Sequence, residues 1–398
     1  MRAFAQVFSF DLISKVLLGG LGIVLIRYMP SGEYATYTLL LSLVAFATQG
    51  VSATFNRLYI LTGGKGGSGD AWPALGLQGM LIGLLAILGL PLIGTLGVGY
   101  GLALALVLAN CASEFAKTCY QRELAFARFS LIEVSRSALF VAIALLLIWQ
   151  YGDGVTAYAV LGVQAASLLF VAWFALRGRL AGSAASVAGS VRYARRFADR
   201  KYFGLFAYFF VVGLFTQADI FMLKIVGDEL MLATYGSAFR YYSILSLALG
   251  AVHVVLLPMI QRAGGAADLL AILARHRRLL LLFATGTALA AWLSGWLIPW
   301  IDAGKYPQAT ATFRVLCISA VISFAFSPHA NLLLRYEAFR FLALAIVAAL
   351  VAHVALCLLL IPSYGAVGAA ISTAVSAALA NAAFYLRAHR LTLRDATA

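Results

Sequence analysis

Charged residues are scarce in this chain: Asp, Glu, Lys and Arg make up 11% of its 398 residues, whereas 63% are hydrophobic. Because soluble domains carry roughly a quarter charged residues, a soluble enzyme is excluded, and so is a disordered or collagen-like chain. The mean hydropathy of +0.95 leaves too little polar surface for a globule in water. We therefore expect the chain to reside in a bilayer.

Residues that support chemistry are also few. The four cysteines lie in or beside apolar runs without metal-site spacing, so we interpret them as small hydrophobic residues and expect no disulfide. The sequence contains no Walker-type lysine loop, no paired carboxylates in an outer loop and no Ser/His/Asp cluster. Nothing in it favours an enzyme.

Long apolar runs dominate instead. They continue unbroken for about 20 residues, the length of a transmembrane helix, and lack the alternation of an outer-membrane β-barrel. The predicted fold is all-α: a polytopic membrane bundle of about twelve transmembrane helices in two pseudo-symmetric six-helix lobes. The expected spans are 9–26, 35–56, 74–95, 98–117, 130–149, 156–176, 203–225, 232–257, 279–300, 313–334, 340–361 and 365–386.

Basic residues are unevenly distributed over this map. Of the 29 Lys and Arg, 23 fall on the side that holds both termini and four on the opposite side. Because basic loops stay in the cytoplasm, we predict a multi-pass protein of the bacterial inner membrane with both termini cytoplasmic. This topology accounts for the net charge of +14 without a nucleic-acid partner.

The longest cytoplasmic connection, 178–201, is a predicted basic linker between an N-terminal lobe, 1–177, and a C-terminal lobe, 202–398. On a helix, Val191, Ala194 and Phe197 would share one side of this linker. Arg192, Arg196 and Arg200 would share another. Such a segment suits the surface of an anionic leaflet, and an ordinary basic topogenic loop explains it equally well.

The two halves resemble each other. Ala35-Thr36-Tyr37 recurs as Ala233-Thr234-Tyr235, and Tyr151-Gly152 recurs as Tyr364-Gly365. Because six helices separate equivalent positions, the repeats run parallel. This is transporter architecture, in which two bundles flank a central path.

Three stretches resemble one known family. The first is DIFMLKIVGDELMLATYGSAFRYYSIL at 219–245, the second LLLIPSYGAVGAAISTAVS at 358–376, and the third IVLIRYMPSGEYATYTLLLSL at 23–43. They are similar to helices seven and eight, the turn between helices eleven and twelve, and the first hairpin of bacterial polysaccharide flippases. These are the Wzx-like members of the multidrug/oligosaccharidyl-lipid/polysaccharide exporter (MOP) superfamily. The resemblance covers about residues 5 to 388.

The resemblance implies flipping of undecaprenyl-pyrophosphate-linked oligosaccharide, such as an O-antigen or exopolysaccharide repeat unit, to the periplasmic leaflet by alternating access. The partners it implies are this lipid-linked glycan, the membrane lipids, and the polymerase and export proteins of polysaccharide synthesis. No cofactor is implied beyond coupling to a proton or sodium gradient. Spans 340–361 and 365–386 carry no carboxylate for the sodium site of some relatives, and twelve helices disfavour the fourteen-helix lipid II flippases.

Two rival functions remain. A drug or metabolite antiporter of the same superfamily would need an acidic cavity for its cations, whereas this chain offers mainly bases. A polysaccharide polymerase or ligase would need a sizeable periplasmic loop with essential bases, and the outer loops are short.

Charges inside the spans each need a partner or a wet cavity. Lys15 either pairs with Asp11, four residues before it, or meets the lipid-linked pyrophosphate. Arg240 has no acidic residue within four positions. It either lines the path beside Tyr241, whose ring suits sugars, or pairs with Asp219, or snorkels outward. Asp219 either binds the coupling cation or holds Arg240 or Lys224.

Charges near the interfaces have two interpretations as well. Arg27, Arg57 and Arg314 either extend a trail of positive charge for the substrate or snorkel to the headgroups. His253 and His353 are interpreted as core histidines rather than proton relays.

Overall fold

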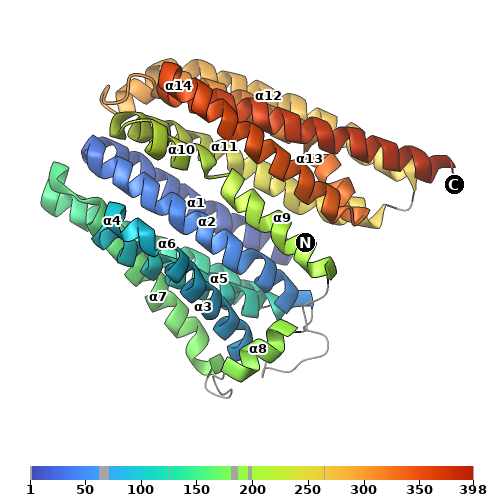
Figure 1. Ribbon diagram of the computed structural model, residues 1–398, viewed down its shortest axis with the longest axis horizontal. Helices are drawn as coiled ribbons and strands as arrows, with labels where there is room; N and C mark the ends of the chain where they lie inside the picture. The colour runs from blue at the N-terminus through green and yellow to red at the C-terminus, as the bar shows by residue number, and fades with distance from the viewer. Residues whose placement is uncertain are drawn as a thin grey trace. The chain divides into compact units, whose positions relative to one another are not determined.

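The computed structural model describes residues 2–61, 71–123, 125–180, 187–195, 200–263 and 265–397. Helices make up all of the regular structure in these ranges (Figure 1). The chain divides into two compact units, Met1–Gln217 and Ala218–Ala398.

The first unit is a bundle in which α1 packs against α6, and α5 packs against both α2 and α7. The short helix α8 packs against α3, and α9 packs against α2. Its helices are α1 (Arg2–Tyr28), α2 (Ser31–Leu61), α3 (Ala71–Leu88), η2 (Leu90–Leu92), α4 (Ile93–Leu96), α5 (Val98–Arg122), α6 (Phe126–Tyr151), η3 (Gly152–Gly154), α7 (Ala157–Leu180), α8 (Val187–Arg195) and α9 (Arg200–Phe215).

The second unit is built around α13, which packs against α11, α12 and α14, while α10 packs against α14. Its helices are α10 (Ala218–Val226), α11 (Glu229–Arg262), α12 (Ala266–Ile301), α13 (Ala309–Arg335) and α14 (Phe339–Thr397). Gly365 has non-helical angles, φ 57° and ψ −133°, and therefore divides α14 into two helices.

The all-helical membrane fold predicted from the sequence is confirmed. Over the described ranges, eight helices are long and apolar enough to cross a membrane, or nine if α9 and α10 form one broken span. Each of the twelve predicted spans lies largely on helix. The lower number arises in part because α14 counts once, although Gly365 separates predicted spans 340–361 and 365–386.

The boundary between the compact units falls at Gln217, beyond the predicted linker 178–201. The reason is that α9 belongs by packing to the first unit: the rings of Phe46 on α2 and Phe210 on α9 are 5.2 Å apart. The lobe limits 1–177 and 202–398 stay a prediction.

The sequence repeat coincides with a repeated local geometry. Ala35 is the fifth residue of α2 and Ala233 the fifth residue of α11, and both are buried. Gly152 has φ 55° and ψ −127°, close to the angles of Gly365. Because these angles are accessible essentially to glycine alone, each Tyr-Gly pair ends one helix and redirects the chain before the next.

The linker helix α8 is oriented by residues that the sequence analysis did not single out, and the two sides predicted for the linker stay a prediction. Ser190 and Tyr193 face the protein, whereas Val191 is exposed together with Arg192 and Arg195. The reason is packing against α3, where the small Gly76 admits Ser190 at close range. Phe197 and Arg196 lie outside the described residues, as does the side chain of Arg200.

Candidate functional site

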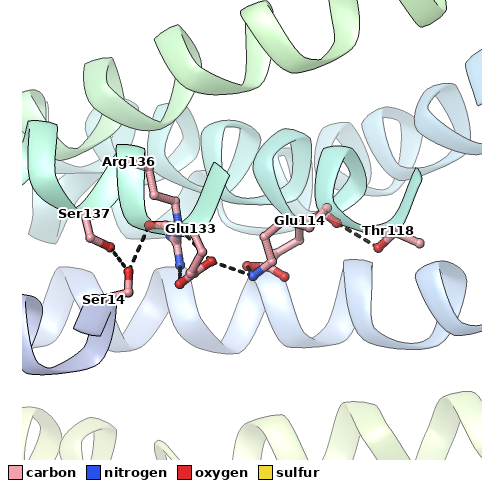
Figure 2. A network of polar contacts seen from close by, with 7 residues as sticks. Ser14, Glu114, Thr118, Glu133, Arg136 and Ser137 are labelled. Atoms are coloured by element: carbon pink, nitrogen blue, oxygen red, sulfur yellow. Dashed lines mark hydrogen bonds and ion pairs between the residues drawn. The ribbon is translucent and has the colours of Figure 1, made fainter. Parts of the chain in front are cut away.

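A cluster of buried and partly buried charges occupies the first unit between α5 and α6 (Figure 2). Glu114 and Lys117 are three residues apart on α5, and Glu133 and Arg136 are three residues apart on α6, so each pair shares a helix face. The Lys117 Nζ lies 2.8 Å from Glu114 Oε1 and 2.8 Å from Glu133 Oε2. Arg136 holds both oxygens of Glu133, with its Nε 3.0 Å from Oε2.

Helix α1 joins this cluster through a hydroxyl. The fully buried Ser14 donates from Oγ to the backbone carbonyl of Glu133 at 2.8 Å, and its Oγ also meets Ser137 Oγ (Figure 2). Three helices of the first unit therefore converge on Glu133.

The charges of this cluster balance, since two carboxylates face two bases. Buried ions are costly unless paired and hydrogen-bonded, and Glu133 receives bonds from both Lys117 and Arg136. The topology predicted from the sequence counts these two bases on the cytoplasmic side, and that count stays a prediction. In the structure both bases lie within helices, since α5 continues to Arg122 and α6 begins at Phe126. The acid and base three residues apart on each helix were the signal that could have revealed the cluster.

Of the other predicted residues in the first unit, Lys15 is partly exposed on α1, directly after Ser14. Arg27 is exposed in the last turn of the same helix. The side chains of Asp11 and Arg57 lie outside the described residues, so the Asp11–Lys15 pair stays a prediction.

A second polar cluster lies in the second unit around Asp219, which is 3% exposed in the first turn of α10. Its Oδ2 accepts a hydrogen bond of 3.0 Å from Thr373 Oγ1 on α14. The buried His353, on the other half of α14, lies close enough to interact electrostatically with the carboxylate. The arrangement combines a buried carboxylate, an imidazole and a hydroxyl.

The imidazole of His353 is itself fixed. Its Nδ1 lies 3.1 Å from Ser376 Oγ and its Nε2 lies 3.4 Å from Cys357 Sγ. The sequence analysis interpreted His353 as a core histidine and did not predict that it lies near Asp219. Among the described residues, no group of three or more His, Cys, Asp and Glu is arranged to hold a metal ion.

The remaining predicted residues of the second unit lie on α11 and α13. Arg240 is partly buried on α11. Tyr241 is buried, and its ring lies edge-on to Phe313 at 6.3 Å. Arg314 is exposed on α13, and its Nε donates to the carbonyl of Ala291 on α12 at 3.0 Å.

Comparison with known proteins finds no match to any family model and none to any curated protein. Solved structures do match. The lipid II flippase MurJ, in an inward closed conformation, has a TM-score of 0.75 at 12% identity, with 98% of this chain and 90% of that chain covered. An inward-facing multidrug resistance MATE family transporter has a TM-score of 0.71 at 14% identity, covering 99% of both chains. A MOP superfamily transporter from Pyrococcus furiosus has a TM-score of 0.57 at 16% identity, with 98% and 93% covered.

The chain has the fold of the MOP superfamily transporters. At these identities the likeness concerns the fold alone, and the proteins that share it are transporters and not enzymes. The superfamily predicted from the three sequence stretches therefore agrees with the fold. The finer resemblance, to Wzx-like polysaccharide flippases, concerns the transported substrate, and it stays a prediction.

Proposed function

We propose that the chain flips a polyprenyl-pyrophosphate-linked oligosaccharide from the cytoplasmic to the periplasmic leaflet of a bacterial inner membrane. O-antigen and exopolysaccharide repeat units are the cargo classes we favour. The observation that carries the proposal is the likeness in fold to a lipid II flippase over 98% of this chain. MurJ is by its description a transporter of a lipid-linked substrate, and the present chain would handle one of the same chemical class.

The charge of the chain supports an anionic cargo. It has 29 basic and 15 acidic residues, and a water-filled path lined by bases attracts pyrophosphate electrostatically. The bases we propose for this path are Lys15, Arg27, Arg57, Arg240 and Arg314. Tyr241 would offer a ring face or hydroxyl to the glycan.

Asp219 is the residue we propose for coupling to a proton or sodium gradient. It is buried, it receives one side-chain hydrogen bond from Thr373, and it lies beside His353. Burying a carboxylate in a membrane protein costs free energy, so such a residue usually has an interaction partner or a function. Proton relay is one such function.

The test is transport by the purified chain in proteoliposomes that contain a fluorescent lipid-linked oligosaccharide. A membrane-impermeant quencher reports how much label has left the outer leaflet. We expect wild-type vesicles to redistribute the label, and Lys15→Ala and Arg240→Ala to lower the rate at least tenfold. Arg278→Ala, which removes an exposed charge from α12, serves as the control and should transport normally. If both cavity variants match wild type, the charged path is wrong.

A second candidate is a drug or metabolite antiporter, which the coverage of 99% of both chains in the MATE comparison favours. The same vesicles, loaded with a cationic dye, separate the two candidates. Dye efflux without movement of the lipid-linked sugar would replace the flippase proposal with this one. A polymerase or ligase would instead lengthen the glycan, which a change in its mass reveals.

A further inference from the structure

Helix α8 is a nine-residue segment of the first unit that lies in none of the twelve predicted spans. It is firmly docked, because Tyr193 is 2% exposed and belongs to a hydrophobic core cluster with Ala71 and Ala74 of α3 and Leu176 of α7. Ser190 is buried one turn earlier, against Gly76 of α3. The orientation of α8 about its own axis is therefore fixed by packing.

The position of α8 coincides with the edge of the membrane-spanning region. The apolar span of α3 begins at Ala71, and that of α7 ends at Arg177. Both ends contribute to the cluster that holds Tyr193. The helix therefore lies at the level where these spans leave the hydrocarbon, on the side predicted to be cytoplasmic.

The outward face of α8 combines an apolar residue with cations. Val191 is 38% exposed, and Arg192 and Arg195 are exposed beside it within one helical turn. At the end of α7, the exposed Arg177 lies 4.7 Å from the ring centroid of Phe174, which is itself 49% exposed. The guanidinium groups of these three arginines therefore lie beside exposed aromatic and aliphatic side chains, at the predicted edge of the bilayer.

Within α8 and the two helices α3 and α7 named above, no acidic residue offsets these cations. The sequences of α3, α7 and α8 contain neither Asp nor Glu. Between Asp153 and Asp219 the chain carries seven Lys and Arg and a single acid, Asp199. The surface is therefore complementary to a layer of negative charge.

We propose that the outward face of α8 and the end of α7 bind the headgroups of anionic phospholipids. Arg192 and Arg195, with Arg177, bind phosphate oxygens through charged hydrogen bonds, and Val191 dips between the upper acyl carbons. The exposed Val191 and Phe174 select a lipid surface over a soluble polyanion, because only the lipid offers hydrocarbon next to phosphate. This proposal does not depend on which cargo the chain carries.

The test places a reporter on the helix. All four natural cysteines are buried, so a Val191→Cys variant is labelled selectively with an environment-sensitive fluorophore. The labelled chain is reconstituted in phosphatidylcholine vesicles with 30 mol% (about one lipid in three) of either brominated phosphatidylglycerol or brominated phosphatidylcholine. We expect stronger quenching by the anionic lipid than by the neutral one at low salt, and a smaller difference at high salt.

Substitution of the arginines then shows whether they cause the preference for the anionic lipid. Adding Arg192→Gln and Arg195→Gln should lower the preference for the anionic lipid about tenfold or more. The control combines Arg277→Gln with Arg278→Gln on α12; it removes the same amount of charge and should leave the preference unchanged. Equal quenching by the two brominated lipids overturns the proposal, as does a preference that survives loss of both arginines. A preference abolished by millimolar inorganic phosphate at constant ionic strength also overturns it, because the site would then bind a soluble anion.

Discussion

Lys117 on α5 and Glu133 on α6 form an ion pair of 2.8 Å in the interior of the first unit. Glu133 also binds Arg136, and its backbone carbonyl accepts the hydroxyl of Ser14 from α1. A single carboxylate thus connects three helices that move together if the unit rocks as a rigid body. Its pairing keeps both bases from being isolated in an apolar interior.

Glu133→Gln should therefore destabilise the protein strongly. The amide removes the charge that Lys117 shares with Arg136 and leaves Lys117 with the partly exposed Glu114, and breaking a buried pair costs about 3 to 5 kcal/mol. Glu114→Gln removes a partner of the same Lys117 from a position that is 35% exposed, so its cost should stay below about 1 kcal/mol. Thermal unfolding in detergent compares the two, and equal losses of stability would contradict a central role for Glu133.

Gly76→Leu should detach α8 from α3. A Cβ at position 76 already collides with Ser190 Oγ, and a leucine side chain demands far more room. A detached helix exposes the backbone after Arg192 and Arg195, so trypsin should cleave there several-fold faster than in wild type. Gly79→Leu, one turn along α3 with no atom within 4 Å of its Cβ position, is the control and should resist like wild type. Identical cleavage of both variants would show that Gly76 does not admit α8.

The spans could be predicted because lipid leaves the backbone few choices. In a bilayer each long apolar run must form a helix to satisfy its own hydrogen bonds, so run length alone located the twelve spans. The Tyr-Gly pairs ending at Gly152 and Gly365 were also visible, and they share one backbone geometry. Both predictions rest on information that is local in the chain.

The acid and base three residues apart on α5 and on α6 were visible in the sequence, but the contacts between helices in the polar clusters could not be predicted, because they depend on how each helix is rotated about its axis. Lys117 and Glu133 are 16 residues apart, and Asp219 and Thr373 are 154 apart. Because these helices are apolar on most of their sides, hydropathy does not reveal which side of a helix packs against which neighbour. The inward face of α8 could not be predicted for the same reason, since Tyr193 faces inward by packing and not by polarity.

Gly365→Ala should lower stability at the break within α14. The glycine has φ 57° and ψ −133°, a conformation that costs a residue with a side chain about 1 to 3 kcal/mol. Its Cβ would also lie 3.2 Å from Gln308 Oε1. Gly286→Ala is the matched control, because Gly286 lies within helix α12 with nothing near its Cβ position. Chemical unfolding measures both, and an unchanged midpoint for Gly365→Ala would show that the break does not require glycine.

Asp219→Asn should uncouple transport from the ion gradient while preserving the fold. The amide oxygen still accepts the Thr373 hydroxyl, but the side chain no longer carries a negative charge or takes up a proton. Vesicles with an imposed proton gradient and vesicles with an imposed sodium gradient are compared. We expect gradient-driven accumulation of cargo to fall at least tenfold, whereas exchange without a gradient continues.

Asp228→Asn is the control for this experiment. Asp228 caps α11 by accepting the Met231 amide at 2.7 Å, and asparagine caps a helix about as well, so coupling should stay intact. The gradient whose effect disappears in Asp219→Asn identifies the coupling ion. Full gradient-driven accumulation in that variant would remove Asp219 from the coupling mechanism and leave the Asp219–Thr373 bond as a contact that only holds α10 against α14.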